Sequence, residues 1–140
     1  MGARRIGRER ALQALYQMEM SALRPEDALD TAWNAEPEGT PDPEAQRFAL
    51  ELVTGVIAHR DEIDGLIEQH SHNWRLDRMA RVDRNVLRLA VFELKWRSDI
   101  PRNVTLNEAV ELGKAFGTEA SSAFVNGLLD RIALDVEQQT

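Results

Sequence analysis

The chain has 140 residues, of which 43% are hydrophobic, with a formal net charge of −7 and no cysteine. This composition supports a packed core in one domain or in two small subdomains, and it excludes disulfides and thiolate zinc sites. No apolar run approaches the roughly 20 residues needed to cross a bilayer, and the basic N-terminus is not followed by the apolar stretch of a signal peptide, so we expect a cytoplasmic protein without a membrane partner.

The first part of the chain is predicted to be helical. Apolar residues recur at spacings of three and four, and no segment alternates apolar and polar residues as a half-buried strand would. One helix is expected over residues 4–22, and a second from Pro25, which suits a first helical position, to Asn34. The inner face of the first helix is formed by Ile6, Ala11, Leu12, Leu15 and Met18. Residues 36–43 contain three prolines and one glycine, which predicts a loop and a hinge.

The middle of the chain continues this pattern. Asp42 is predicted to cap a helix that starts at Pro43. The apolar stripe of that helix consists of Phe48, Leu52, Val53, Val56 and Ile57. Another helix is expected over residues 61–70. Residues 86–96 are apolar on most sides, which is typical of a helix at the centre of a bundle, and Asp83 is placed to cap that helix.

Two further helices complete the prediction. The sequence from Thr105 to Glu108 spells a capping box, so a helix should start there and end at Gly117, a residue that favours a left-handed stop. The last helix carries an apolar stripe of Phe124, Val125, Leu128, Leu129, Ile132 and Val136. Helices joined by short links predict an all-α fold, in which the helices pack as a bundle.

The N-terminal arginines are the first candidate binding residues. Residues 1–10 hold Arg4, Arg5, Arg8 and Arg10 against Glu9, a local positive charge in an acidic chain. On a helix, the first three of these arginines project to neighbouring positions on one face, and we expect all three to face solvent. Guanidinium forks match phosphate oxygens bidentately, so this face is suited to a nucleic-acid backbone. The alternative is a basic end that only aids solubility, and on charge alone this alternative is favoured, because short basic runs are common.

Tyr16 lies two turns beyond Arg8, near the same helical face. Its ring could stack on a base or receive a side chain from a partner protein. Alternatively, it could pack against Leu12 and Leu15 and keep only its hydroxyl in water. On the sequence alone, the packed ring is the favoured interpretation.

Arginines also recur at spacings of three and four between residues 75 and 88. They could form a second phosphate-binding ridge, or they could pair with the acidic segment at residues 61–68. Because Asp77 and Asp83 are interleaved among them, the structural interpretation is favoured.

Signals of catalysis are weak. His70 and His72 are two residues apart, so on a helix they point to different faces and are poor joint metal ligands. Lys114 follows a glycine as in a phosphate-binding loop, but Glu108 stands where that loop needs its first glycine. Ser121 has no histidine nearby in the sequence. We therefore expect no enzyme, no cofactor and no metal site.

Several stretches together resemble the NusB family of transcription antitermination proteins. They are RRIGRERALQALY at 4–16, VDRNVLRLAVFEL at 82–94, DIP at 99–101, NEAVEL at 107–112 with FG at 116–117, and FVNGLLD at 124–130. Their order and spacing follow the family pattern over essentially the whole chain. The resemblance implies an all-α fold: a single domain over residues 1–140, with two small helical subdomains, each like a three-helix bundle, packed around a central helix. The expected subdomains are residues 1–75 and 76–140.

The resemblance also implies partners. Family members bind boxA-type single-stranded RNA jointly with ribosomal protein S10, also called NusE, in a complex that suppresses transcription termination, notably on ribosomal RNA operons. Other antitermination factors and RNA polymerase are then indirect partners. By position, the RNA-contacting residues would be Arg4, Arg5, Arg8, Phe124 and Asn126. Tyr16 and Asp83 match positions on the S10-facing side.

The chain departs from the family at a few positions. Ile6 interrupts the arginine run, and Ala120 and Ala123 stand where members often carry charged residues. These departures bear on the RNA and S10 affinities. Ile6 and the acidic net charge support an alternative in which the protein is a helical adaptor between proteins or a homodimer with only marginal RNA binding. The salt dependence of RNA affinity distinguishes the RNA-binding factor from the adaptor, because phosphate contacts release counterions and affinity then falls steeply as salt rises.

Overall fold

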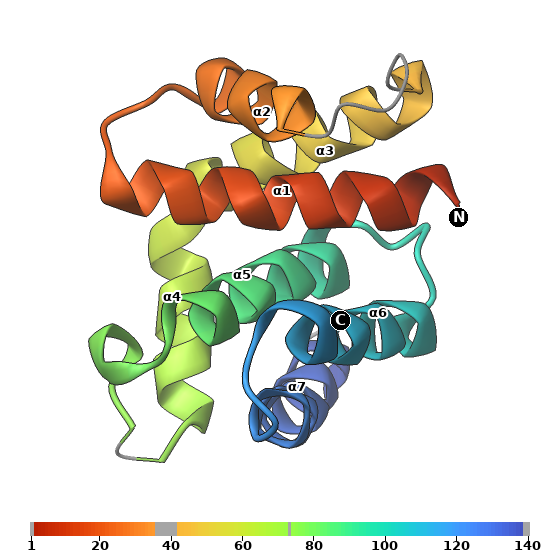
Figure 1. The fold of residues 1–140 in the computed structure, drawn as a ribbon. Helices are drawn as coiled ribbons and strands as arrows, with labels where there is room; N and C mark the ends of the chain where they lie inside the picture. Colours follow the sequence, from red (N-terminus) through yellow and green to blue (C-terminus); the bar gives the residue numbers. More distant parts are fainter. Residues whose placement is uncertain (1, 36–41, 73, 139–140) are drawn as a thin grey trace. The chain divides into compact units, whose positions relative to one another are not determined.

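The computed structural model describes residues 2–35, 42–72 and 74–138, which form seven α-helices and one short 3-10 helix and contain no strand (Figure 1). The elements are α1 (Ala3–Met20), α2 (Pro25–Asn34), α3 (Pro43–Ala58), α4 (Arg60–His70), η1 (Leu76–Arg78), α5 (Arg81–Trp96), α6 (Arg102–Phe116) and α7 (Ser121–Gln138). The predicted all-α class is confirmed. Most of the predicted loop at 36–43 falls on residues 36–41, outside the described residues.

The chain forms two compact units, residues 1–58 and 59–140. The division therefore comes earlier in the chain than the expected one between residues 75 and 76. Helix α4 accounts for the difference, since it packs against α5 and α7 of the second unit. Its apolar face, Ile63, Leu66 and Ile67, is buried.

In the first unit, α1 packs against both α2 and α3. The predicted cap at Asp42 is confirmed, because Asp42 Oδ1 accepts a hydrogen bond from the Glu44 backbone N–H at 2.8 Å. Gly7 lies where α1 meets α3: a Cβ placed on it would be 3.0 Å from Phe48 Cδ2 and 3.1 Å from the Ala45 carbonyl oxygen. The two helices approach this closely because position 7 carries no side chain. Ile57, expected in the apolar stripe of α3, is exposed instead.

In the second unit, α5 packs against α4, α6 and α7 and supplies the largest share of buried side chains. The prediction that this helix is central to its bundle is confirmed for this unit. The helix begins at Arg81, however, well before Val86, and Asp83 is not its cap. The backbone at Met79 and Ala80 is extended, so Ala80 occupies the cap position and Asp83 lies inside the first turn. A carboxylate is favoured there by the helix dipole.

Two predictions for α6 are wrong. The helix starts at Arg102 directly after Pro101, whose φ of −60° and ψ of 141° place it at the cap. Thr105 is therefore an interior residue, and its hydroxyl donates a 2.9 Å hydrogen bond to Oε1 of the buried Glu93 on α5. Gly117 ends α6 as expected, but with φ −102° and ψ −161° it is extended rather than left-handed.

Candidate nucleic-acid interface

The N-terminal turns of α1 present Arg4 and Arg5 to solvent. No acidic residue lies in this first turn, and Gly2 at the cap contributes no side-chain hydrogen bond. The positive end of the helix dipole therefore adds to the field of the two guanidinium groups. An exposed pair of arginines on one helical end is suited to phosphate oxygens. The prediction that these two side chains face solvent is confirmed.

Arg8 differs from Arg4 and Arg5. It is only 4% exposed, so the prediction that it faces solvent is wrong. Its guanidinium lies over the ring of Phe48 on α3, with Cζ 5.3 Å from the ring centroid. Arg4 approaches the same ring at 5.2 Å. The two arginines are one helical turn apart, so both extend along the side of α1 that meets α3.

The next arginine of the run, Arg10, also packs within the first unit. Its Nη1 donates a hydrogen bond to Gln13 Oε1 at 3.1 Å, and its Cζ lies 5.6 Å from the ring centroid of Trp33 on α2. Phe48 and Trp33 were missed as residues that contact the arginines. Each sits on a different helix from the arginines, so no spacing within the arginine segment points to either ring.

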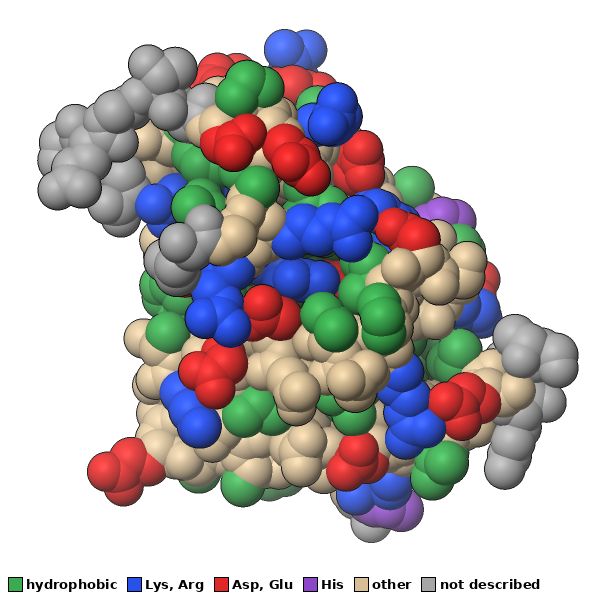
Figure 2. All heavy atoms as spheres, turned by 90° about the vertical axis from the view of Figure 1, so that its right-hand side faces the viewer, with side chains coloured by type: hydrophobic (Ala, Val, Ile, Leu, Met, Phe, Trp, Pro, Cys, Tyr) green, Lys and Arg blue, Asp and Glu red, His purple; other side chains and the backbone are tan. Residues whose placement is uncertain are grey.

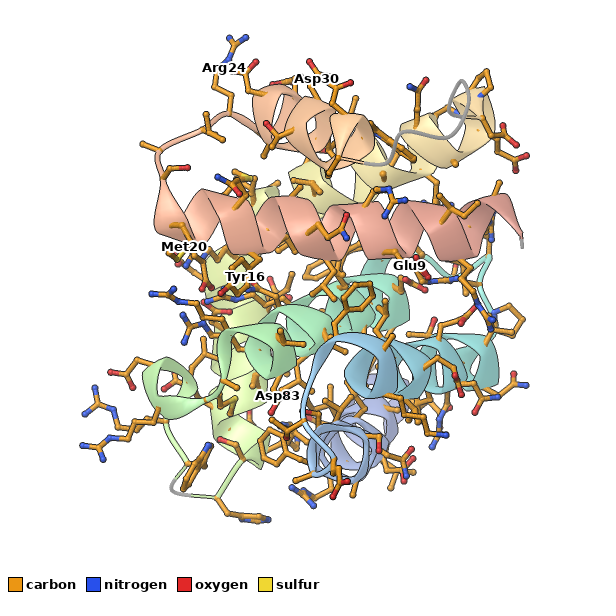
Figure 3. All side chains as sticks on the ribbon, viewed as in Figure 1. Glu9, Tyr16, Met20, Arg24, Asp30 and Asp83 are labelled. Atoms are coloured by element: carbon orange, nitrogen blue, oxygen red, sulfur yellow. The ribbon has the colours of Figure 1, made fainter. Side chains whose placement is uncertain are left out.

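Tyr16 and Met20 form an exposed apolar patch on α1. They are 41% and 56% exposed and lie one helical turn apart, near the C-terminal end of the helix (Figure 3). Two large apolar side chains at neighbouring exposed positions suit a protein partner better than water. The favoured interpretation of Tyr16 as a packed ring is wrong, because the side chain is exposed. Met20 was missed, although its spacing of four from Tyr16 would have found it.

Asp83 lies in the first turn of α5, in the second unit (Figure 3). Its Oδ1 atom is buried and has no hydrogen-bond partner among the described residues. Burying a carboxylate oxygen without a hydrogen-bond donor costs free energy. A partner molecule that donates a hydrogen bond to this oxygen would remove that cost.

Phe124 and Asn126 lie on α7, also in the second unit. Phe124 is half-buried and Asn126 is exposed. The entry to α7 is fixed by Ser121, whose hydroxyl oxygen accepts a hydrogen bond from the Thr118 backbone N–H at 2.9 Å. Ala120 and Ala123, the two departures from the family pattern, are both exposed near this entry.

The arginines between residues 75 and 88 mostly serve the second unit itself. Arg88 is buried and makes a bidentate pair with Asp64 on α4, through Nε to Oδ1 at 2.8 Å and Nη2 to Oδ2 at 3.1 Å. Arg84 donates to the Met79 carbonyl at 3.1 Å. The structural interpretation is confirmed for these two residues, and the acidic segment at 61–68 supplies the partner of Arg88. Arg75 pairs only loosely with Asp77 at the surface.

Charges of both signs reach the surface of the molecule. Figure 2 shows Asp and Glu side chains beside Lys and Arg side chains on the face that it draws.

Across residues 2–35, 42–72 and 74–138, no group of three or more His, Asp or Glu side chains is placed to hold a metal ion. The helices in these ranges also lack the combination of length and hydropathy that a membrane span requires.

Comparison with known sequences identifies relatives over nearly the whole chain. The model of the NusB family matches residues 5–134. Transcription antitermination protein NusB of Myxococcus xanthus is 70% identical over 135 residues, which cover 96% of this chain and 96% of that protein. The NusB protein of Bacillus velezensis is 47% identical over 134 residues, covering 96% of this chain and 98% of the relative.

Solved structures agree with the sequence relatives. A structure of T. maritima NusB superposes with a TM-score of 0.85 at 40% identity, covering 96% of this chain and 92% of that one. A chain in the crystal structure of antitermination factors NusB and NusE in complex with dsRNA gives a TM-score of 0.85 at 28% identity, covering 95% and 97%. Matches of this length, in both sequence and fold, show that the chain belongs to the NusB family.

Proposed function

We propose that this protein is a transcription antitermination factor that binds boxA-type single-stranded RNA together with ribosomal protein S10 (NusE), notably during transcription of ribosomal RNA operons. The observation that carries the proposal is the exposed pair Arg4 and Arg5 at the positive end of α1. Relatives of the protein carry the name transcription antitermination protein, which supports the proposal. Other antitermination factors and RNA polymerase are engaged indirectly.

The RNA contacts divide by chemistry. Arg4 and Arg5 neutralise phosphates, which provides affinity without sequence preference. Phe124 offers a half-buried ring on which an unpaired base can stack, and Asn126 offers an amide that pairs with a base edge. Arg8 is buried, so it supports the exposed pair from within the protein and does not face the RNA directly.

The proposed S10 contacts come from both units, with Tyr16 in the first and Asp83 in the second. Tyr16 and its neighbour Met20 supply exposed apolar area, and Asp83 supplies a carboxylate. A solved NusB relative is found in complex with NusE, and it shares this fold over 95% of the present chain. We propose that S10 binds at Tyr16 and Asp83.

A titration tests the proposal. Fluorescence anisotropy of a labelled boxA-type RNA is measured at two salt concentrations, with and without S10, against an RNA of scrambled sequence. We expect the logarithm of the association constant to fall linearly with the logarithm of the salt concentration. We also expect the affinity to increase when S10 is added. Absence of binding to the boxA-type RNA under all four conditions would overturn the proposal.

A protein adaptor or homodimer is the second candidate, and the exposed Tyr16 and Met20 favour it. Sedimentation velocity of the protein alone and with S10, in the absence of RNA, measures this association directly. Tight association with S10 or with itself, combined with RNA binding that is weak and insensitive to salt, would make the adaptor the better description.

We further propose that the protein acts in the cytoplasm and has no catalytic activity of its own. Both proposals are supported by membership of a family whose members are named for transcription antitermination. Incubation of the purified protein with boxA-type RNA, followed by mass spectrometry of the RNA, should return the RNA without a change in mass.

A further inference from the structure

Phe48 is placed to act on two arginines at once. It lies on α3, it is buried, and the guanidinium carbons of Arg4 and Arg8 lie 5.2 Å and 5.3 Å from its ring centroid. Both distances are within the range in which a cation is attracted to the face of an aromatic ring. All three residues belong to the first unit.

The approach of the ring to α1 is enforced by the backbone. A Cβ on Gly7 would come within 3.0 Å of Phe48 Cδ2, so the ring packs directly against the α1 backbone between the two arginines in sequence. Arg4 is exposed whereas Arg8 is buried. The ring therefore contacts one guanidinium that is accessible to RNA and one that is not.

We propose that Phe48 is a positioning residue for RNA binding: its ring fixes Arg4 and Arg8 in one arrangement before RNA arrives, so that Arg4 loses less side-chain freedom when it meets a phosphate. This inference rests on the proposed function and deepens it. A long flexible arginine loses considerable rotamer freedom on immobilisation, and an arrangement formed in advance reduces that loss.

The inference predicts a distinct pattern of salt dependence. Removing the ring leaves every positive charge in place, so the number of counterions released should not change. Affinity should then fall by the same factor at every salt concentration. Removing the charge itself, as in Arg4→Ala, should instead reduce the salt slope by about one.

The test compares Phe48→Leu with the parent, using boxA-type RNA across a range of salt concentrations. We expect Phe48→Leu to bind on the order of threefold to thirtyfold more weakly with an unchanged salt slope. Phe48→Tyr, which keeps the ring, should bind nearly as tightly as the parent. Val53→Ala, which removes buried volume from the same helix, controls for lost stability and should bind as the parent does once folded.

A second measurement needs no RNA. The ring current of Phe48 should shift the side-chain proton resonances of Arg4 and Arg8 in the parent, and Phe48→Leu should remove both shifts. Absence of the shifts in the parent would overturn the arrangement. If the parent binds RNA and Phe48→Leu binds equally well, only the positioning role is wrong. If the parent itself does not bind RNA, the proposed function fails, and the positioning role fails with it.

Discussion

Three neighbouring arginines have different roles because of what surrounds each one. Arg4 and Arg5 are exposed, whereas Arg8 is buried against Phe48. Helical spacing places all three on adjacent positions, and it cannot distinguish them, because the ring that covers one comes from a different helix. The sequence therefore predicts exposure for all three, which is confirmed for Arg4 and Arg5 and wrong for Arg8.

We expect the double substitution Arg4→Ala with Arg5→Ala to leave folding nearly unchanged, because exposed charges contribute little to stability. RNA affinity should fall by roughly 1–3 kcal/mol, and its salt dependence should become shallower. Arg24→Ala, which removes another exposed arginine from the same unit, is the control and should change neither quantity. Equal RNA binding by the double variant and the parent would show that this end of α1 is not the RNA site.

Gly7 offers a prediction about packing. Gly7→Ala gains helix propensity, but the new methyl meets a backbone carbonyl at 3.1 Å as well as the Phe48 ring. The carbonyl cannot move without shifting α3, so we expect a net loss of stability of about 1 kcal/mol. Gly65→Ala, whose Cβ would meet nothing within 4 Å, should instead be stabilising. Thermal melts of the two variants should shift in opposite directions.

At the scale of elements, helix type and number follow from periodicity, whereas the starts of helices do not follow from residues that have the type of a cap. The starts of α5 and α6 show this: Asp83 and Thr105 have the residue types of caps, yet both lie inside their helices. The extended backbone at Ala80 and Pro101 sets those starts. Once inside α6, the Thr105 hydroxyl serves the buried Glu93 rather than its own backbone.

Thr105→Val should therefore destabilise the protein by about 1–3 kcal/mol, because a buried carboxylate loses a donor. Thr54→Val is the control: that hydroxyl is exposed and donates to the Leu50 carbonyl of its own helix. Chemical denaturation should show a clear loss for Thr105→Val and little change for Thr54→Val. Similar midpoints for the two variants would mean that the Glu93 contact contributes nothing to folding.

The central position of α5 gives the largest expected effect. Leu89 and Phe92 are both buried in it. An unpaired carboxylate at either position costs several kcal/mol, comparable to the stability of a whole domain of this size. We expect Leu89→Asp or Phe92→Asp to abolish cooperative melting, whereas Leu134→Asp, on the exposed side of α7, should retain it. A normal melt of the Leu89 variant would contradict the central role of α5.

At the scale of the whole molecule, an acidic chain carries a basic end. The net charge of −7 disfavours RNA when averaged over the protein, but the arginines at the start of α1 create a local field of opposite sign. Asp83 became a candidate partner residue only through the resemblance to the NusB family. The all-α class and the identity of Arg4, Arg5 and Tyr16 as candidates came from local patterns. The division of the chain after residue 58 did not, because it depends on which unit buries α4.

The glycine at position 7 has a consequence for any attempt to use the arginine segment alone. A glycine in a helix interior costs about 1 kcal/mol, and α1 also lacks a side-chain cap and an acidic first turn. Without α3, a peptide of residues 2–21 should therefore be mostly unstructured in water, since even favourable isolated helices of this length are marginal. The arginine segment therefore cannot be transferred to another protein as a peptide, because its helical conformation depends on packing against α3 as much as on its own sequence.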